Sequence, residues 1–194
     1  MKQEPLKVGF DLDGVILYNP ARVARPILAF LSNQVLHKQK KEFYIPKTPF
    51  AEWFWHMLHK TSLTPSPAYK SVQKLISEGK IEAYLITGRY HTLESDFDHW
   101  LDKLDARSYF QSCVYNKDNE QPHIFKKRMI EKFGVNIFIE DTWDIVRLLN
   151  ENSGRKKPLT VLWVTNFLDQ FIPYPYKYFS LKGAVEYVEG VLKK

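Results

Sequence analysis

The chain has 194 residues, enough for one domain with a sizeable core, and its 44% hydrophobic and 26% charged residues are an ordinary globular composition. No run of eighteen or more apolar residues occurs, so the sequence predicts no membrane span. The single cysteine, Cys113, excludes an internal disulfide and, with no secretory leader pattern, predicts a cytoplasmic protein. The net charge of +6 favours anionic ligands, and nucleic acid is possible but not favoured because the basic runs 37–41 and 154–158 are short.

Five short apolar runs have the length and composition of strands buried on both faces. They are Lys7–Asp11, Ala83–Thr87, Ser112–Asn116, Asn136–Glu140 and Thr160–Val164. Apolar residues three and four apart predict helices over Leu93–Leu104, Phe125–Phe133 and Ile145–Leu149, and Ser180 indicates the start of a last helix, Leu181–Leu192. Strands that alternate with helices predict an α/β fold, a Rossmann-like parallel sheet of about five strands flanked by helices.

The segment from Tyr18 to Gly79 interrupts this alternation. It shows no strand pattern but three helical stretches, Ala21–Lys40, Phe50–Lys60 and Ala68–Ser77, separated by prolines. The sequence therefore predicts a helical insert over residues 18–79 and a core over residues 1–17 and 80–194. Near the end, Phe171–Phe179 is too rich in proline for a helix and is expected to be a surface loop anchored by its aromatic residues.

Two aspartates follow the first predicted strand, in the stretch "KVGFDLDGV". Asp11 comes at the carboxyl end of the strand, where parallel sheets bind ligands, and Asp13 points the same way if the backbone stays extended. Two adjacent carboxylates repel unless a cation is present or one of them is protonated. A Mg²⁺ ion would neutralise Asp11, and a protonated Asp13 could act as a general acid. Gly14 then allows a sharp turn, although an isolated Asp-x-Asp-Gly turn could also be purely structural.

Polar residues also end or border other predicted strand–helix units. Thr87, Gly88 and Arg89 close the second strand, where a hydroxyl and backbone N–H groups suit a phosphoryl oxygen, although Thr87 could simply cap a helix. Lys126 or its neighbour Lys127 could neutralise a phosphoryl group, and one of the two is expected to be an ordinary surface lysine.

The fourth strand ends with two adjacent acids, Glu140 and Asp141, which suit a cation. Asp144 either supports them or interacts with a helix dipole. Because all these strand ends lie along one rim of a parallel sheet, the sequence predicts a single site there.

The motifs "DLDGV", "LITGR", the helix lysine and "IED" occur in an order that resembles the haloacid dehalogenase-like phosphatase superfamily over residues 6–17 and 80–165. The resemblance implies that Asp11 is a nucleophile forming an aspartyl-phosphate, and that Asp13 protonates the leaving oxygen and then activates water. It implies that Thr87 holds the phosphoryl group and Lys126 stabilises its charge. Asp141 would complete a Mg²⁺ site with Asp11 and the backbone carbonyl of Asp13.

The position of the insert is similar to the superfamily's helical cap of the first type. Tyr18 and Arg22 begin this insert just after the first motif, so we expect them to contact the leaving group. Gly88 is expected to bind substrate through its backbone, and Arg89 is expected either to bind substrate or to form a salt bridge to the cap. The spacing from Lys126 to the acidic motif is similar to that of nucleotidases, although Glu140 stands where those proteins usually have an aspartate, and it is a further candidate metal ligand. We therefore expect a Mg²⁺-dependent phosphatase for a small phosphorylated metabolite, with a nucleoside monophosphate favoured. The alternatives are a nucleic-acid-binding protein and a non-catalytic protein that binds a phosphate ligand.

Overall fold

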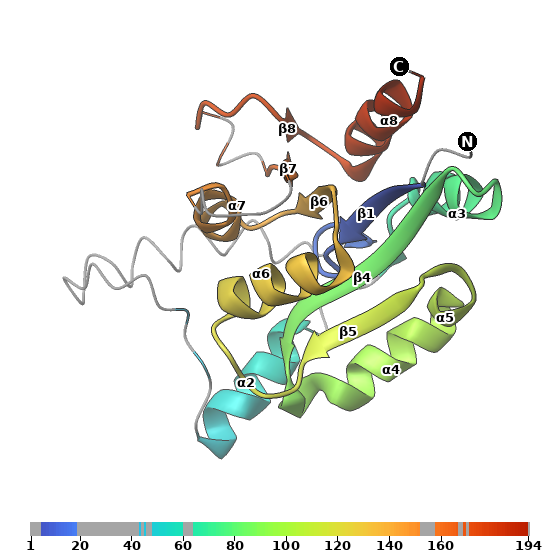
Figure 1. The fold of residues 1–194 in the computed structure, drawn as a ribbon. Coiled ribbons are helices and arrows are strands. Elements are labelled where there is room, and N and C mark those ends of the chain that lie inside the picture. Colours follow the sequence, from blue (N-terminus) through green and yellow to red (C-terminus); the bar gives the residue numbers. More distant parts are fainter. Residues whose placement is uncertain are drawn as a thin grey trace.

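The computed structural model describes residues 5–18, 43, 45, 48–59, 64–151, 158–166, 169 and 171–193, and every structural statement below concerns these residues. Six strands form one sheet in which each neighbouring pair is parallel (Figure 1). They are β1 (Leu6–Phe10), β4 (Ile81–Tyr90), β5 (Ser112–Asn116), β6 (Ile137–Glu140), β7 (Thr160–Val164) and β8 (Lys177–Tyr178). The predicted α/β fold with a parallel sheet is confirmed, with one strand more than expected.

The order of the strands places β1 at the point where the chain reverses direction across the sheet. Their spatial order is β5-β4-β1-β6-β7-β8, so the chain first builds β4 and β5 on one side of β1 and then returns to its other side. There β6 pairs with β1, with Val8 opposite Ile137 and Phe10 opposite Ile139. Ligands of open parallel sheets bind beyond the carboxyl ends of the two strands at such a reversal. Here Asp11 follows β1, and β6 ends with Glu140, which is followed by Asp141.

Helices cover both faces of the sheet, which explains why its strands are apolar almost throughout. One face packs against α3 (Tyr69–Ser77), α4 (Glu94–Lys103), α5 (Ala106–Tyr109) and α8 (Leu181–Leu192), and the other against α6 (Pro122–Phe133) and α7 (Trp143–Asn150). Successive strand residues alternate between the two cores, since Ala83 and Leu85 join the first and Tyr84 and Ile86 the second. None of the described helices is long and apolar enough to cross a membrane.

The described part of the predicted insert contains two of its three expected helices. They are α2 (Pro49–His59) and α3, whereas Ala21–Lys40 lies outside the described residues. The expectation of no strand between Tyr18 and Gly79 is wrong, because β2 (Leu17–Tyr18) pairs antiparallel with β3 (Thr64–Pro65). Strands of two residues are too short for a periodic signal. Helix α3 packs into the core of the sheet, where the Tyr69 hydroxyl donates to the Leu104 carbonyl at 3.0 Å.

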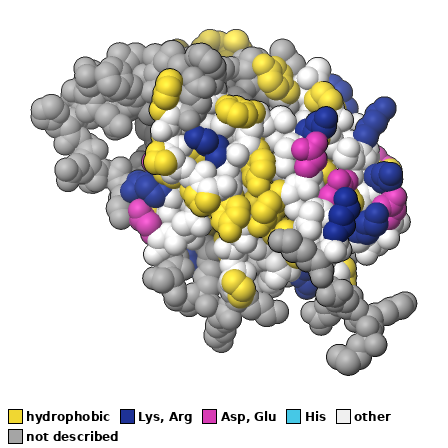
Figure 2. All heavy atoms as spheres, turned by 90° about the horizontal axis from the view of Figure 1, so that it is seen from above, with side chains coloured by type: hydrophobic (Ala, Val, Ile, Leu, Met, Phe, Trp, Pro, Cys, Tyr) yellow, Lys and Arg dark blue, Asp and Glu magenta, His cyan; other side chains and the backbone are white. Residues whose placement is uncertain are grey.

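The proline-rich segment near the end departs from the expected loop, because it includes the edge strand β8. Strand β8 pairs with β7, and the Trp163 N–H of β7 donates to the carbonyl of Tyr176, the residue before β8, at 2.8 Å. Prolines are tolerated next to an edge strand, which pairs on one side only. As predicted, aromatic residues anchor the segment, and the Tyr174 hydroxyl donates to the Val161 carbonyl at 2.8 Å. Figure 2 looks down on this side of the molecule and shows hydrophobic side chains spread over it.

Candidate active site

A tight turn after β1 holds both aspartates of the first motif. The Asp11 N–H donates to the Ile139 carbonyl at 3.0 Å, which extends the β1–β6 ladder by one bond beyond β1. The Leu17 N–H then donates to the Leu12 carbonyl at 2.8 Å, so the chain folds back at once. Both aspartates are buried. The turn therefore keeps two carboxylates inside the protein at the reversal point of the sheet.

Gly14 brings this turn against the end of β6. Its φ of +80° is in the left-handed region, which favours glycine, and a Cβ at this position would lie only 2.1 Å from Asp141 Oδ2. Any larger residue would therefore push Asp141 away from the turn. The close approach joins the first and last motifs of the sequence in space.

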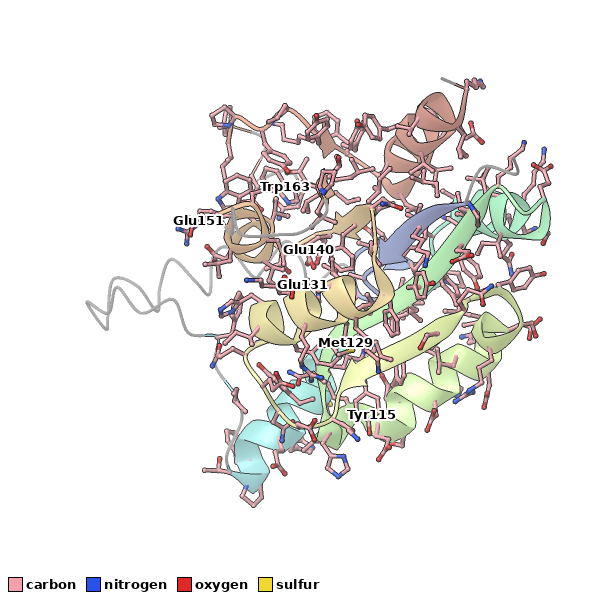
Figure 3. The ribbon with its side chains drawn as sticks, viewed as in Figure 1. Tyr115, Met129, Glu131, Glu140, Glu151 and Trp163 are labelled. Carbon is pink, nitrogen blue, oxygen red and sulfur yellow. The ribbon has the colours of Figure 1, made fainter. Side chains whose placement is uncertain are left out.

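Lys126 projects from α6 into the acidic cluster. Its Nζ lies 3.1 Å from Asp11 Oδ2 and 2.7 Å from Glu140 Oε2, and all three side chains are buried. Figure 3 labels Glu140, which lies next to α6 at the end of β6. Lys127 is only half-buried, so Lys126 is the lysine of this pair that meets the acids.

Glu140 is held by groups of this chain through both of its carboxylate oxygens. Oε1 accepts the N–H groups of Asp141 and Thr142 at 3.2 and 2.9 Å, while Oε2 accepts Lys126. Trp163 of β7 donates from Nε1 to the Asp141 carbonyl at 3.0 Å. The sequence analysis missed Thr142 and Trp163, because no local pattern shows that their hydrogen bonds fix the acidic end of β6.

The electrostatics of the cluster reflect three buried carboxylates around one lysine. Burial raises the pKa of Asp11 well above its usual value; Lys126 lowers it, and the neighbouring acids raise it again. Burial likewise raises the pKa of Glu140, against the effect of Lys126. For Lys126 itself burial acts to lower the pKa, but Asp11 and Glu140 outweigh it and raise the pKa. The lysine is therefore charged at neutral pH.

The donor set of this cluster fits a divalent cation. One carboxylate oxygen from each of Asp11, Glu140 and Asp141 can be chosen such that all three lie within 4.8 Å of one another. Asp11 Oδ1 is buried and accepts no hydrogen bond from the described residues. Carboxylate oxygens are ligands that Mg²⁺ prefers, so the spacing of these three groups suits such an ion. A divalent cation at this position would offset the repulsion between the three carboxylates.

Strand β4 does not end at Thr87, as the sequence predicted, but continues to Tyr90 through a bulge. Thr87 lies opposite Tyr115 and Tyr90 opposite Asn116, so Gly88 and Arg89 are the extra residues. Thr87 is buried, and its Oγ1 accepts the Arg89 N–H at 3.4 Å. A Cβ at Gly88 would lie 3.2 Å from Pro122 Cβ, which shows how closely the bulge approaches the start of α6.

Arg89 turns from this bulge to Asp13. Its Nε and Nη2 donate to the two carboxylate oxygens of Asp13, each at 2.8 Å, and its Nη1 donates to Asp96 of α4 at 2.5 Å. Burial acts to lower the pKa of Arg89, but Asp13 and Asp96 outweigh it and raise the pKa. Asp96 was missed by the sequence analysis, because the two residues meet only through the bulge.

The remaining predicted residues lie apart from the cluster or outside the described chain. Tyr18 in β2 is 58% exposed, and Arg22 lies outside the described residues. Asp144 is exposed at the start of α7, where Arg147 Nη2 lies 3.5 Å from its Oδ1. Its expected support of Glu140 and Asp141 is not seen, and its position in the first turn of a helix matches the alternative.

No family model matches the chain, and no curated protein matches it in sequence. Solved structures do match in fold. A HAD hydrolase of family IA, variant 3, from Entamoeba histolytica is 10% identical with a TM-score of 0.61, over 97% of this chain and 100% of that one. CbbY from Rhodobacter sphaeroides in complex with phosphate is 11% identical with a TM-score of 0.55, over 90% and 94%. A HAD-superfamily hydrolase from Ehrlichia chaffeensis is 13% identical with a TM-score of 0.52, over 99% and 100%.

These matches and the strand order define the class of fold. The chain has the fold of the haloacid dehalogenase-like superfamily, as the resemblance of its motifs predicted. Because the identities are low, the likeness concerns the fold, and the chemistry has to be argued from the side chains.

Proposed function

We propose that the protein is a Mg²⁺-dependent phosphatase that hydrolyses a small phosphate monoester through an aspartyl-phosphate on Asp11. The observation that carries this proposal is the environment of Asp11 at the reversal of the sheet. One of its oxygens contacts Lys126, and the other is buried and accepts no hydrogen bond from the described residues. A carboxylate held in this way has a free oxygen for attack and a cation beside it to reduce its repulsion from phosphate.

The reaction has two steps at phosphorus. In the first, an Asp11 oxygen bonds to phosphorus as the ester P–O bond breaks, and Asp13 gives its proton to the departing oxygen. In the second, water attacks phosphorus, Asp13 takes a proton from that water, and the bond from phosphorus to Asp11 breaks. Lys126 neutralises charge on the phosphoryl oxygens, and the Thr87 hydroxyl with the Gly88 backbone binds them.

Asp11, Asp141 and the backbone carbonyl of Asp13 would hold the Mg²⁺ ion. When bound, the ion would neutralise negative charge where the phosphoryl group approaches Asp11. Glu140 belongs to the same donor set, but its oxygens already accept Lys126 and two backbone N–H groups. We therefore assign Glu140 the task of holding the lysine and the end of β6, rather than direct contact with the ion.

The proposed substrate is a nucleoside monophosphate or a similarly small phosphate ester. Asp13 supports an ester over a carbon–halogen bond, since a halide leaves without a proton. The preference for a nucleotide rests on the motif spacing and on aromatic side chains in the insert. Phe50 and Trp53 of α2 are exposed, with ring centroids 5.9 Å apart, and exposed rings can stack on a base.

A phosphatase screen tests the proposal. Nucleoside monophosphates, sugar phosphates and a 5′-phosphorylated oligonucleotide are incubated with the protein in Mg²⁺ or in EDTA, and released phosphate is measured. We expect Mg²⁺-dependent release from small esters, its loss in Asp11→Asn and its retention in the matched variant Asp144→Asn. Unchanged turnover in Asp11→Asn would remove Asp11 from the reaction. Binding of phosphate esters with no turnover would instead favour a non-catalytic protein.

A further inference from the structure

Arg89 is the most completely enclosed cation of the site, and all three of its guanidinium nitrogens are used by carboxylates. Its side chain is 0% exposed. Nε and Nη2 form a two-point contact with Asp13 at 2.8 Å each, and Nη1 reaches Asp96 at 2.5 Å. An arginine that binds substrate phosphate needs its donors directed at the ligand, whereas these donors are directed at the protein's own acids.

The bulge in β4 explains how Arg89 reaches Asp13. Without the two extra residues, the alternation of side chains along β4 would continue regularly beyond Thr87. Because the bulge shifts Arg89, its guanidinium reaches Asp13 in the turn after β1. Asp96 in the first turn of α4 contacts the guanidinium from the other side. A planar guanidinium that binds both carboxylate oxygens fixes the rotation of the carboxylate, which a single hydrogen bond does not.

We propose that Arg89 is a positioning residue for Asp13, anchored in turn by Asp96, and that it acts on the leaving-group side of the reaction instead of binding the phosphoryl group. This inference rests on the proposed function. Proton transfer needs the donor oxygen within hydrogen-bond reach of the departing oxygen. Each carboxyl oxygen has more than one acceptor position, so Asp13 can keep both contacts with Arg89 while the proton on one oxygen moves to the leaving group.

The proposal predicts a loss that depends on the leaving group. A nitrophenolate is stable enough to depart without a proton, whereas an unsubstituted phenolate or an alkoxide has to be protonated as it departs. Losing Arg89 should therefore slow the esters of poor leaving groups and spare those of good ones. A purely structural role would slow all esters equally, and a role in phosphate binding would weaken all of them through KM.

The experiment measures kcat/KM for 2,4-dinitrophenyl, p-nitrophenyl and phenyl phosphate with Mg²⁺, in the wild type, Arg89→Met, Arg89→Lys and Asp13→Asn. This ratio covers steps up to formation of the aspartyl-phosphate, so the later role of Asp13 toward water does not enter. We expect Arg89→Met to lose about 100-fold on phenyl phosphate and less than about 3-fold on the dinitrophenyl ester. Arg89→Lys should fall between the wild type and Arg89→Met.

The double variant Arg89→Met, Asp13→Asn supplies a second criterion. If Arg89 acts through Asp13, the double variant should be no slower on phenyl phosphate than Asp13→Asn alone. Asp96→Asn retains Arg89 and should show a smaller loss with the same dependence on the leaving group, which keeps the test usable if Arg89→Met does not fold. Arg107→Met is the matched control, because this exposed arginine also pairs with two aspartates, Asp98 and Asp102.

Two results would overturn the proposal. One is an equal loss across the three esters in Arg89→Lys and Asp96→Asn, and the other is a double variant slowed by the product of the two single losses. Failure of the proposed function is a separate outcome, because the wild type would then release no phosphate from these three esters or from any ester of the screen.

Discussion

Lys126 Nζ lies 2.7 Å from Glu140 Oε2, and neither side chain is exposed beyond 2%. The pair links α6 to the carboxyl end of β6, and the same ammonium group contacts Asp11 at 3.1 Å. A buried lysine between two acids is retained at a high desolvation cost, which is offset only while its partners are present. The contact therefore makes the stability of the fold depend on a residue to which we assign a part in the chemistry.

Replacing Lys126 should destabilise the protein strongly. Lys126→Met leaves two buried carboxylates without their cation, and we expect the free energy of unfolding to fall by about 3–5 kcal/mol. Adding Glu140→Gln should recover part of this loss, because it removes one of the two charges. Urea unfolding in EDTA measures both. The half-buried neighbour gives the control, since Lys127→Met should cost less than about 1 kcal/mol. Equal costs at positions 126 and 127 would contradict the arrangement.

A glycine should be required at position 14 for two reasons. A side chain there would clash with Asp141, and the backbone conformation favours glycine. Gly14→Ala introduces a Cβ 2.1 Å from Asp141 Oδ2, whereas at Gly79, with φ of +66°, a Cβ would meet no atom of the described residues within 4 Å. Both variants should lose about 1–2 kcal/mol to backbone strain. Only Gly14→Ala should also lose phosphatase activity, because Asp141 must move. If Gly14→Ala kept the activity of Gly79→Ala, the contact between the turn and Asp141 would not matter for the site.

Magnesium should stabilise the folded protein through Asp141. Binding at 100 times the dissociation constant adds about 2.7 kcal/mol. For a domain of this length, that energy corresponds to a rise in Tm of roughly 5–10 °C. We expect a rise of this order in scanning calorimetry on replacing EDTA with 10 mM Mg²⁺. The rise should fall by more than half in Asp141→Asn and persist in Asp144→Asn, whose exposed aspartate pairs with Arg147. Equal rises in the two variants would place the ion elsewhere.

The thiol of Cys113 should react slowly at mildly alkaline pH. Burial raises its pKa to about 11, with Arg107 acting in the opposite direction. Only the thiolate is alkylated, so a raised pKa means that the reactive fraction is still increasing above pH 9. In the folded protein, the rate with iodoacetamide should rise tenfold per pH unit from 7 to 10. In urea the rate should level off above about pH 9. If the alkylation rate levelled off at the same pH in the folded protein and in urea, Cys113 would be solvated in the fold.

The sequence predicted those parts of the fold and site that local patterns encode. Five strands were visible as apolar runs, and Asp11 and Asp141 as acids at strand ends, because the carboxyl ends of parallel strands must share one rim. Strand β8 was missed because Lys177 and Tyr178 are too few for a pattern. The contact of Arg89 with Asp13 was missed for another reason. It depends on a bulge, which is set by pairing with β5 and not by the residues of β4 alone.

The sequence predicted only in part which lysine contacts the acidic cluster. Lys126 and Lys127 look alike in the sequence, and only the resemblance to the superfamily favoured Lys126. The structure adds the orientation of α6, which buries Lys126 and leaves Lys127 half-buried. Tertiary packing decides which of two adjacent helix residues points inward.

Chemical trapping of the intermediate tests the central claim most directly. An aspartyl-phosphate is reduced by borohydride to homoserine, so the protein is mixed with a substrate from the screen, quenched within a turnover and reduced. Tandem mass spectrometry then locates the change. We predict homoserine at position 11, formed only when both substrate and Mg²⁺ are present. Continued turnover with an unmodified Asp11, or with the modification at another residue, would contradict the assignment of Asp11 as the nucleophile.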